Sequence, residues 1–426
     1  MTQQMDSSPE SSVSQPRGQQ CKMKLALLLV GLAFSAVVFL TLDWFRSAAI
    51  QRAAGKPKNC GVRDPVRHHA FKPNCGSIER WGGDVGVYEF FTNNLGLRDQ
   101  SIREVPLADA RPRILMLGNS FTQGMIAWRD SYVGRIAAGL PQYDFLNGGV
   151  VGYSVSNYLN LTRMLLAQGV DIDEVIVFAG VTEVQYEAAF YKDVDASGAV
   201  TVPERRHGTV PWYLTVRNKI TMHLLLTNSI LDSLARFLVR HGCYRFAPGL
   251  LGSDVFDLEG FAWTYRKVNE ADPFPVGYGP LGVEGGEAKA KAKMTLLWQE
   301  LQKRNIPISV VVYPYPAQLL HDTPDSRQVR LWRDWCEGKC KRFITVFPEF
   351  FAAKQQCPRL QPGCWYQKLF LFGDLHYNAA GDALVADAVI KSLEEDPPDK
   401  SNRPLRPGDS SQNSSVTKRN RFRRPR

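Results

Sequence analysis

The fold is decided by residues 113–122, Arg-Ile-Leu-Met-Leu-Gly-Asn-Ser-Phe-Thr. Four consecutive apolar residues, 114–117, predict a strand that is buried on both faces, as in a parallel sheet. The Gly-Asn-Ser that follows is typical of a turn that leads into a helix. In open α/β sheets reactive groups gather where strands end and helices begin. We therefore expect Ser120 to lie at the edge of such a sheet.

Apolar runs and helical stretches alternate on the C-terminal side of this segment. Further short strands are expected at 145–146, 174–179, 308–313 and 343–347, and helices at about 128–139, 155–168, 286–304, 326–336 and 379–394. This alternation predicts an α/β fold, a doubly wound parallel sheet between two helical layers. We assign it to residues 111–396, with an insertion at 190–285 that contains an amphipathic stretch at 221–239.

The region before this domain divides into three parts. Residues 25–42 are 18 uncharged, mostly apolar positions, which at ~1.5 Å per residue reach nearly across the hydrocarbon core of a bilayer. We interpret them as a transmembrane helix that follows a disordered cytoplasmic leader, residues 1–24. A cleaved signal peptide is the alternative, with 47–49 as a weak cleavage site. Residues 43–110 are rich in Gly, Pro and Asn, contain one strand-like run at 85–92, and are read as an N-terminal extension.

The net charge of +10 does not indicate a nucleic-acid-binding protein. Residues 400–426 carry nine Lys or Arg against a single acid, Asp409, so most of the excess charge lies in one segment. We interpret residues 397–426, which are rich in Ser, Asn and Pro, as a disordered basic tail. Attachment of this tail to an anionic lipid or another polyanion is the alternative, but only Phe422 interleaves the charges as an aromatic.

The cysteines favour an oxidising compartment. Seven of the eight follow the apolar run, and six of them form pairs that are close in sequence: Cys60 with Cys75, Cys336 with Cys340, and Cys357 with Cys364. We predict three disulfides and export of the domain, with Cys243 left over. A zinc site made by the last four paired cysteines is the alternative, although their spacing lacks the usual Cys-x-x-Cys knuckles.

Three strand ends carry residues suited to acyl transfer. The first is Ser120, the second is the Gly-rich run 147–154, and the third is Gly373-Asp374-Leu375-His376, just ahead of the last helix. A serine hydroxyl, a base to take its proton and an acid to orient the base are what nucleophilic catalysis requires. Each piece alone is more often a turn or a helix cap, and only their combination favours a catalytic site.

These motifs resemble those of the SGNH/GDSL hydrolase superfamily, from about Asp64 to Glu395. Gly118-Asn119-Ser120-Phe121-Thr122 is similar to the first block, Gly-Asp-Ser-Phe-Thr, and 147–152 ends at the glycine of the second. The segment 92–99 is similar to the family's approach to the first block. The most specific match is 374–381, Asp-Leu-His-Tyr-Asn-Ala-Ala-Gly. Membrane-anchored bacterial members of the family are often associated with cell-surface polysaccharide.

The resemblance implies a role for each matching residue. Ser120 is expected to be the nucleophile, His376 the general base and Asp374 the residue that orients it. The N–H groups of Ser120 and Gly152 are expected to bind the developing oxyanion, and no metal or other cofactor is needed. It further implies an acylated small-molecule or glycan substrate, and a single-pass protein of the inner membrane with its domain on the periplasmic side.

The chain departs from the family pattern at three positions. Asn119 replaces the usual Asp, and the Asp-x-His spacing is one residue short. In the third block Thr182 stands where the family has the Asn whose side chain completes the oxyanion hole, and loss of one donor can cost about 100- to 1000-fold in rate. We therefore expect a serine esterase and keep two alternatives, an O-acyltransferase with the same triad and a catalytically weak glycan-binding or assembly protein.

Overall fold

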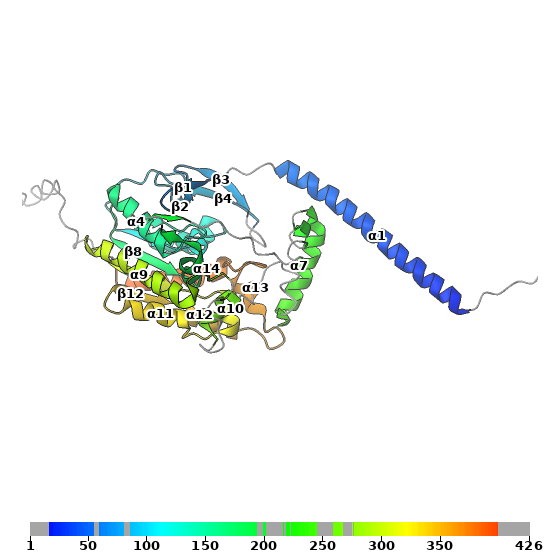
Figure 1. Cartoon of the computed structure of the whole chain (residues 1–426). Coiled ribbons are helices and arrows are strands. Elements are labelled where there is room, and N and C mark those ends of the chain that lie inside the picture. The colour runs from blue at the N-terminus through cyan, green and yellow to red at the C-terminus, as the bar shows by residue number, and fades with distance from the viewer. Residues whose placement is uncertain are drawn as a thin grey trace, which may run out of the picture.

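The computed structural model describes residues 17–54, 59–80, 86–193, 199–201, 216, 219–221, 223–244, 259–266, 275 and 277–398. It consists of a globular α/β body and a long N-terminal helix that leaves the body on one side (Figure 1).

Five parallel strands form the centre of the body. They are β6 (Arg113–Leu117), β7 (Asp144–Asn147), β8 (Glu174–Ala179), β11 (Ile308–Val312) and β12 (Cys340–Thr345). Their order is β12-β11-β8-β6-β7, so β6 lies between β7 and β8 and the chain changes direction across the sheet at β6. Such a reversal defines the switch point at which doubly wound folds bind ligands. The predicted doubly wound fold is therefore confirmed.

Helices cover both faces of the sheet. Successive side chains of β6 point to opposite sides, so the apolar side chains on each face pack against a helical layer of their own. Ile114 and Met116 pack in a core with α3 (Tyr132–Gly139) and α14 (Ala379–Glu395). Leu115 and Leu117 pack in a second core with α4 (Val155–Ala167) and α9 (Gly282–Gln302). The remaining named elements of the body are α2 (Ser120–Gln123), η1 (Trp128–Asp130), α5 (Thr182–Gln185), η2 (Tyr186–Phe190), β9 (Lys192–Asp193), β10 (Val200–Thr201), α7 (Leu225–Arg240), η4 (Glu259–Thr264), α10 (Pro316–His321), α11 (Arg327–Cys336), α12 (Phe347–Gln355) and α13 (Cys364–Leu369).

The N-terminal extension adds strands to the same sheet. β5 (Arg98–Asp99) pairs antiparallel with β7, and β4 (Val87–Thr92) and β3 (Gly76–Arg80) continue the sheet outward to eight strands. β1 (Gly61–Asp64) and β2 (His68–Phe71) form a separate hairpin. The sheet is thus mixed, where the sequence predicted only its parallel part. β5 has two residues and shows no period that could be recognised.

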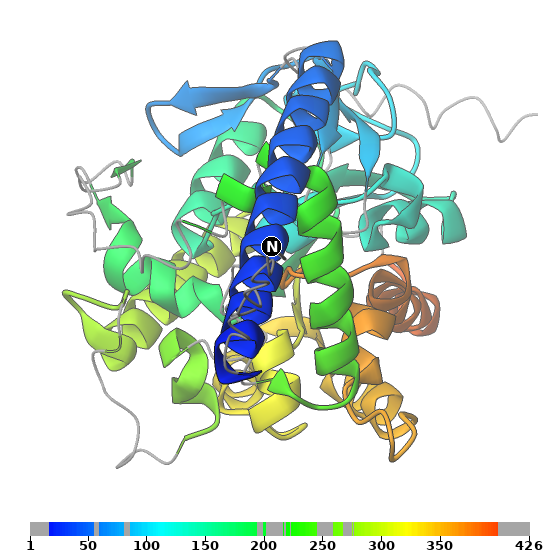
Figure 2. The ribbon, with the colours of Figure 1, turned by 90° about the vertical axis from the view of Figure 1, so that its right-hand side faces the viewer.

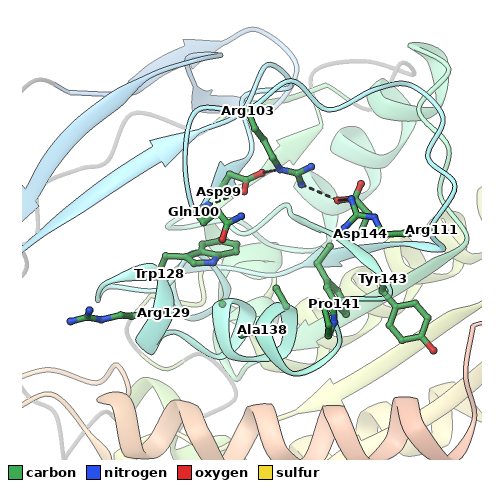
Figure 3. Close-up of a pocket in the computed structure, with 13 residues that line it drawn as sticks. Asp99, Gln100, Arg103, Arg111, Trp128, Arg129, Ala138, Pro141, Tyr143 and Asp144 are labelled. Atoms are coloured by element: carbon green, nitrogen blue, oxygen red, sulfur yellow. Dashed lines mark hydrogen bonds and ion pairs between the residues drawn. The ribbon is translucent and has the colours of Figure 1, made fainter.

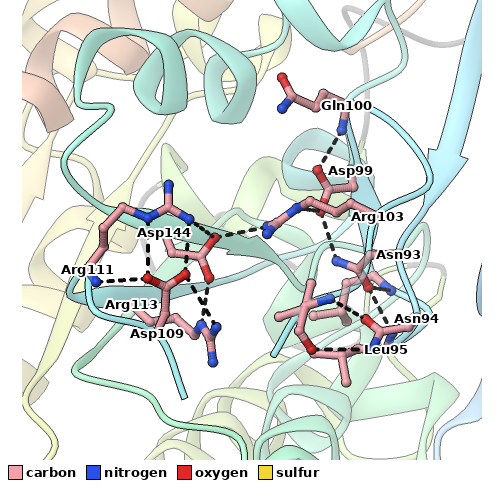
Figure 4. Close-up of polar contacts among 12 residues, drawn as sticks. Asn93, Asn94, Leu95, Asp99, Gln100, Arg103, Asp109, Arg111, Arg113 and Asp144 are labelled. Carbon is pink, nitrogen blue, oxygen red and sulfur yellow. Dashed lines mark hydrogen bonds and ion pairs between the residues drawn. The ribbon is translucent and has the colours of Figure 1, made fainter. Parts of the chain in front are cut away.

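A network of charged side chains fixes the end of the extension to the sheet (Figure 4). Arg113 at the start of β6 donates from Nε to Asp144 Oδ2 over 2.7 Å, and both side chains are buried. Arg103 donates to Asp144 Oδ1 over 3.0 Å and to Asp99 Oδ2 over 2.7 Å. Buried carboxylates and guanidinium groups need such partners. The segment that carries Asp99 and Arg103 is therefore bound to β6 and β7.

The N-terminal helix α1 extends from Arg17 to Ala54 and contains a candidate membrane span, Lys24–Ile50. The helix begins earlier than predicted, so residues 17–24 of the expected leader are helical. Polar residues can continue a helix that an apolar run has begun, because propagation costs less than nucleation. Leader residues 1–16 and tail residues 399–426 lie outside the described part of the chain.

The three predicted cysteine pairs are disulfides. The S–S distances are 2.07 Å for Cys60–Cys75, 2.10 Å for Cys336–Cys340 and 2.05 Å for Cys357–Cys364. The four cysteines of the alternative zinc site are bonded in pairs, so that alternative is wrong. Cys243 is exposed and free. In the predicted insertion, the amphipathic stretch forms α7, whereas much of 190–285 is outside the described residues.

Candidate active site

The three predicted segments meet at the carboxyl ends of the parallel strands. Ser120 is the first residue of α2, directly after β6. Residues 148–152 follow β7. Asp374 and His376 lie in the turn between α13 and α14, so the prediction that they follow a strand is wrong. Because all strands of the parallel core point the same way, their carboxyl ends share one edge, and the switch point at β6 lies there.

Ser120, His376 and Asp374 form a hydrogen-bonded chain. His376 Nε2 is 2.7 Å from Ser120 Oγ, and His376 Nδ1 is 2.6 Å from Asp374 Oδ1. A carboxylate only accepts hydrogen bonds, so the ring N–H lies on Nδ1 and Nε2 is left to accept the Ser120 hydroxyl proton. The short Asp-x-His spacing therefore still lets the acid reach the imidazole.

The turn that holds Asp374 and His376 is itself constrained. Asp374 Oδ1 accepts the backbone N–H groups of Leu375 over 2.6 Å and of His376 over 3.1 Å. The Tyr366 hydroxyl donates to the carbonyl of Asp374 over 2.7 Å. The Phe121 ring packs on the imidazole, with centroids 4.7 Å apart, and His376 is only 7% exposed. These contacts restrict the imidazole to the orientation that faces Ser120.

Asn119 fixes the start of the helix that carries Ser120. Its Oδ1 accepts the N–H of Phe121 over 3.0 Å as the N-cap of α2 and also accepts the Tyr313 hydroxyl over 3.0 Å. The Ser120 N–H is the first of the helix and has no intrahelical partner. Gly118 permits this tight exit from β6, because a Cβ there would lie 1.7 Å from Thr122 Oγ1. The N–H of Ser120 therefore makes no hydrogen bond within its own helix.

The amide of Asn119 connects the site to a buried polar cluster. Nδ2 donates to Thr182 Oγ1 over 3.1 Å and to Glu183 Oε1 over 3.3 Å. The Thr182 hydroxyl also lies 3.2 Å from the Tyr315 hydroxyl, and either oxygen can be the donor. Thr182 is 7% exposed. The structure thus places Thr182 beside Asn119, with its hydroxyl in contact with Asn119 and Tyr315.

Glu183 is the acidic member of this cluster and is fully buried. Its Oε1 accepts the Tyr158 hydroxyl over 2.8 Å. Burial raises the pKa of the Glu183 carboxyl to about 7, because the charged form loses its hydration. A group that titrates near neutrality thus lies one residue beyond Thr182 and in contact with Asn119.

The Gly152 loop is fixed by side chains from three elements. Gly152 has φ of +77°, which glycine adopts without strain. Gln123 Oε1 accepts the N–H of Val151 over 2.7 Å, and His69 Nε2 is 2.7 Å from the carbonyl of Val151. The Tyr191 hydroxyl donates to the Gly152 carbonyl over 2.6 Å. The direction of the Gly152 N–H is therefore set by contacts on both sides of its peptide.

Sequence reasoning assigned no role to His69, Gln123 or Glu183. Residue 69 lies on the β1–β2 hairpin, 82 positions from Val151, to which its ring is bonded. Burial lowers the pKa of the His69 imidazole, which favours the neutral ring. The only sequence signal for Glu183 was its position directly after Thr182 in the third block. His69 had no signal beyond its place within the stretch from Asp64 to Glu395 over which the chain resembles the superfamily.

Two hollows open on the described surface near the extension. One of about 420 Å³ is lined by the hairpin, by aromatic residues of β4 and by Gln123, Val150 and Val151, so it adjoins the Gly152 loop. The other, of about 410 Å³, lies between α3 and the Arg103–Asp144 network, with Trp128 and Arg129 at its rim (Figure 3). None of the predicted site residues lines either hollow.

Several solved structures, esterases among them, resemble this chain in fold. The acetylxylan esterase Axe2 from Geobacillus stearothermophilus is 12% identical with a TM-score of 0.36, and the match covers 68% of this chain and 96% of that one. The SGNH-hydrolase family esterase AlinE4 is 14% identical with a TM-score of 0.30, covering 68% and 100%. A gut microbial diltiazem-metabolizing enzyme is 11% identical with a TM-score of 0.36, covering 68% of this chain and only 48% of that one.

No family model matches the chain, and no curated protein matches it. Identities and TM-scores this low say nothing about a substrate.

Proposed function

We propose that the protein is a serine ester hydrolase with Ser120 as nucleophile, His376 as general base and Asp374 as the orienting acid. The observation that carries the proposal is the continuous chain of hydrogen bonds from Asp374 through His376 to the Ser120 hydroxyl, 2.6 Å and 2.7 Å long. A scaffold that only binds glycan has no need of an imidazole held between an acid and an alcohol.

The reaction proceeds in two steps. Ser120 Oγ attacks the ester carbonyl while His376 Nε2 takes the hydroxyl proton, and Asp374 stabilises the imidazolium that forms. The tetrahedral intermediate collapses, and His376 returns the proton to the leaving alcohol. Water then attacks the acyl-enzyme with His376 again as base, which releases the acid and restores Ser120.

The oxyanion of both intermediates is proposed to bind the N–H groups of Ser120 and Gly152. Support comes from the place of Ser120 as the first residue of α2, where its N–H has no intrahelical partner, and from the contacts that orient the Gly152 peptide. Thr182 is the proposed third donor. Because Asn119 donates to its oxygen, its own proton is free for an oxyanion when Tyr315 donates to the same oxygen. Each such donor is typically worth several kcal/mol in the transition state.

The proposed substrate is a small acyl ester, such as acetyl on a cell-surface polysaccharide. The acyl class follows from the triad, and the glycan follows from the resemblance to polysaccharide-associated SGNH members. Residues 25–42 are proposed to anchor the chain in the inner membrane with residues 111–396 on the periplasmic side. The three disulfides support an oxidising location.

Acyl transfer is the alternative reaction of the same acyl-enzyme. A sugar hydroxyl then replaces water in the second step, and His376 deprotonates it in the same way. The two reactions differ in product, so release of free acetate and formation of an acetylated sugar, measured together with an oligosaccharide present, distinguish them.

The test compares the full-length wild type with Ser120→Ala and His376→Ala in detergent on short acyl esters. We expect both variants to lose at least about 10⁴-fold in kcat, as in other serine triads. Ser229→Ala and His321→Ala are matched controls outside the site and should retain wild-type turnover. A fluorophosphonate should label wild-type protein at Ser120 and leave Ser120→Ala unlabelled. Equal background turnover in all five proteins contradicts the proposal.

A further inference from the structure

Helix α7 exposes an apolar surface on the side that faces away from the body. Leu226, Ile230, Leu234 and Phe237 are 39%, 54%, 48% and 59% exposed, and their spacing places them along one face. We call these four residues the α7 stripe. The buried residues of the helix, Ala235 and Val239, lie on the opposite face. A surface helix of a water-soluble protein normally has polar residues on its outer face.

The beginning of α7 is bonded to helix α1. The carboxylate of Asp43 accepts the backbone N–H groups of Leu226 over 3.0 Å and Thr227 over 2.8 Å. Ser47 Oγ accepts the N–H of Leu225 over 2.9 Å. Asp43 and Ser47 are both buried, and together they cap the first turn of α7. These bonds therefore fix the first turn of α7 beside residues 43–47 of α1.

Residues 43–47 lie at the end of the apolar run of α1. Asp43 directly follows Leu42, the last residue of the run, and at ~1.5 Å per residue Ser47 lies only about one turn beyond it. Trp44 and Phe45, between them, are 47% and 62% exposed. Exposed aromatic residues at the end of a membrane span are typical of the interface between acyl chains and water. In a membrane crossed by α1, α7 begins in the headgroup region.

The two helices diverge from this junction. Figure 1 shows α7 against the body while α1 leaves it, so the two helices draw apart from the junction. Figure 2, viewed from the side of α1, shows both helices in front of the body. The outer face of α7 is thus turned toward the side of the molecule from which α1 departs. This is the side on which a bilayer crossed by α1 lies.

We propose that α7 is an interfacial helix whose stripe is inserted in the headgroup region of the membrane that α1 crosses. The inference rests on the proposed membrane anchor and adds a second lipid contact to it. A lipid surface is favoured over a protein partner because Leu226, the first residue of the stripe, is bonded to Asp43, which directly follows the exposed apolar run of α1. An amphipathic helix with an apolar stripe lies with that face buried about 5–10 Å into the boundary between headgroups and acyl chains.

This contact is connected to the proposed active site. The Arg236 guanidinium lies 4.0 Å from the centre of the Phe372 ring, and Gln367 Nε2 donates to the carbonyl of Arg236 over 2.9 Å. Phe372 precedes Asp374 by two residues. Helix α7 therefore contacts the lipid surface with one face and the segment that carries Asp374 with another.

The experiment places a nitroxide on single cysteines in the full-length chain, with Cys21 and Cys243 replaced by serine. Three positions are compared: Leu32→Cys in α1, Ile230→Cys in the stripe and Lys303→Cys at the exposed end of α9. The protein is reconstituted in vesicles of equal parts phosphatidylcholine and phosphatidylglycerol. Collisions with oxygen, which concentrates in lipid, and with a water-soluble nickel complex are measured for each label.

We expect lipid accessibility at Leu32→Cys, aqueous accessibility at Lys303→Cys, and at Ile230→Cys a depth of about 5–10 Å below the headgroups. Lipid at position 32 with water at position 230 overturns the inference and leaves the anchor intact. Water at position 32 overturns the anchor itself. Low accessibility of position 230 to both reagents also overturns the inference, because it indicates a protein partner or a second copy of this chain.

Discussion

Glu183 should make the stability of this protein depend on pH in a way that one substitution removes. Glu183→Gln keeps an oxygen to accept the Tyr158 hydroxyl and the Asn119 amide, and it cannot ionise. Glu183 Oε2 has no hydrogen-bond partner among the described residues. The new amide N–H₂ at that position stays unpaired, so at pH 4 we expect the variant to be no more stable than the wild type.

The magnitude follows from the pKa of the buried carboxyl, which burial raises from 4.5 to about 7. The folded wild type retains a proton that the unfolded chain releases, so its stability falls as the pH rises from 4.5 to about 7. Below 4.5 both states are protonated, and above 7 both are ionised and the loss is complete. The loss amounts to about 3 kcal/mol. The difference in unfolding free energy should shift toward Glu183→Gln by that amount between pH 4 and pH 8.

Urea unfolding followed by circular dichroism at several pH values measures this difference. Glu300→Gln is a control of opposite sign. Slight burial acts to raise the pKa of Glu300, but hydrogen bonds from Lys303 and Arg304 outweigh it, so the pKa is lowered. The Glu300 carboxylate stabilises the folded state at pH values above its pKa in the unfolded chain. This stability is lost as the pH falls through the lower pKa of the folded state. The control should thus become less stable than wild type on raising the pH. Parallel curves for wild type and Glu183→Gln refute the reasoning and assign Glu183 an ordinary pKa.

Three further substitutions test the parts of the site in kinetic or thermal assays. Thr182→Asn restores a side-chain amide to the proposed oxyanion hole, and we expect kcat on short esters to rise by up to about 100-fold. An unchanged kcat means that this side chain does not face the substrate. His69→Ala removes the hydrogen bond to the Val151 carbonyl. From the loss of this orienting bond we expect kcat to fall about tenfold with little change in KM. A change confined to KM argues instead for a contact between His69 and the substrate. Asn119→Ala removes the N-cap of α2 and should lower the unfolding free energy by about 1 kcal/mol and reduce kcat. Full activity at lower stability would show that Ser120 needs no positioning by the cap.

The sequence alone determined the parallel core and the local geometry around two site residues. Apolar runs buried on both faces and the helices between them required a doubly wound sheet, because each side of a strand such as β6 needs its own apolar layer. Asp374 and His376 are two residues apart, and Asn378 caps α14 by accepting the N–H groups of Ala380 and Gly381. Hydropathy period and helix capping are local properties, so short stretches of sequence contain them.

The tertiary structure decided everything that joins distant residues. Ser120 and His376 are 256 positions apart, and only the strand order that places β6 at the switch point brings them to one edge. The raised pKa of Glu183 arises because tertiary packing removes water from its carboxyl. The bonds from His69 to the Gly152 loop and from Asp43 to α7 likewise depend on where whole elements pack. Such contacts depend on the combined packing of many residues, which no local pattern specifies.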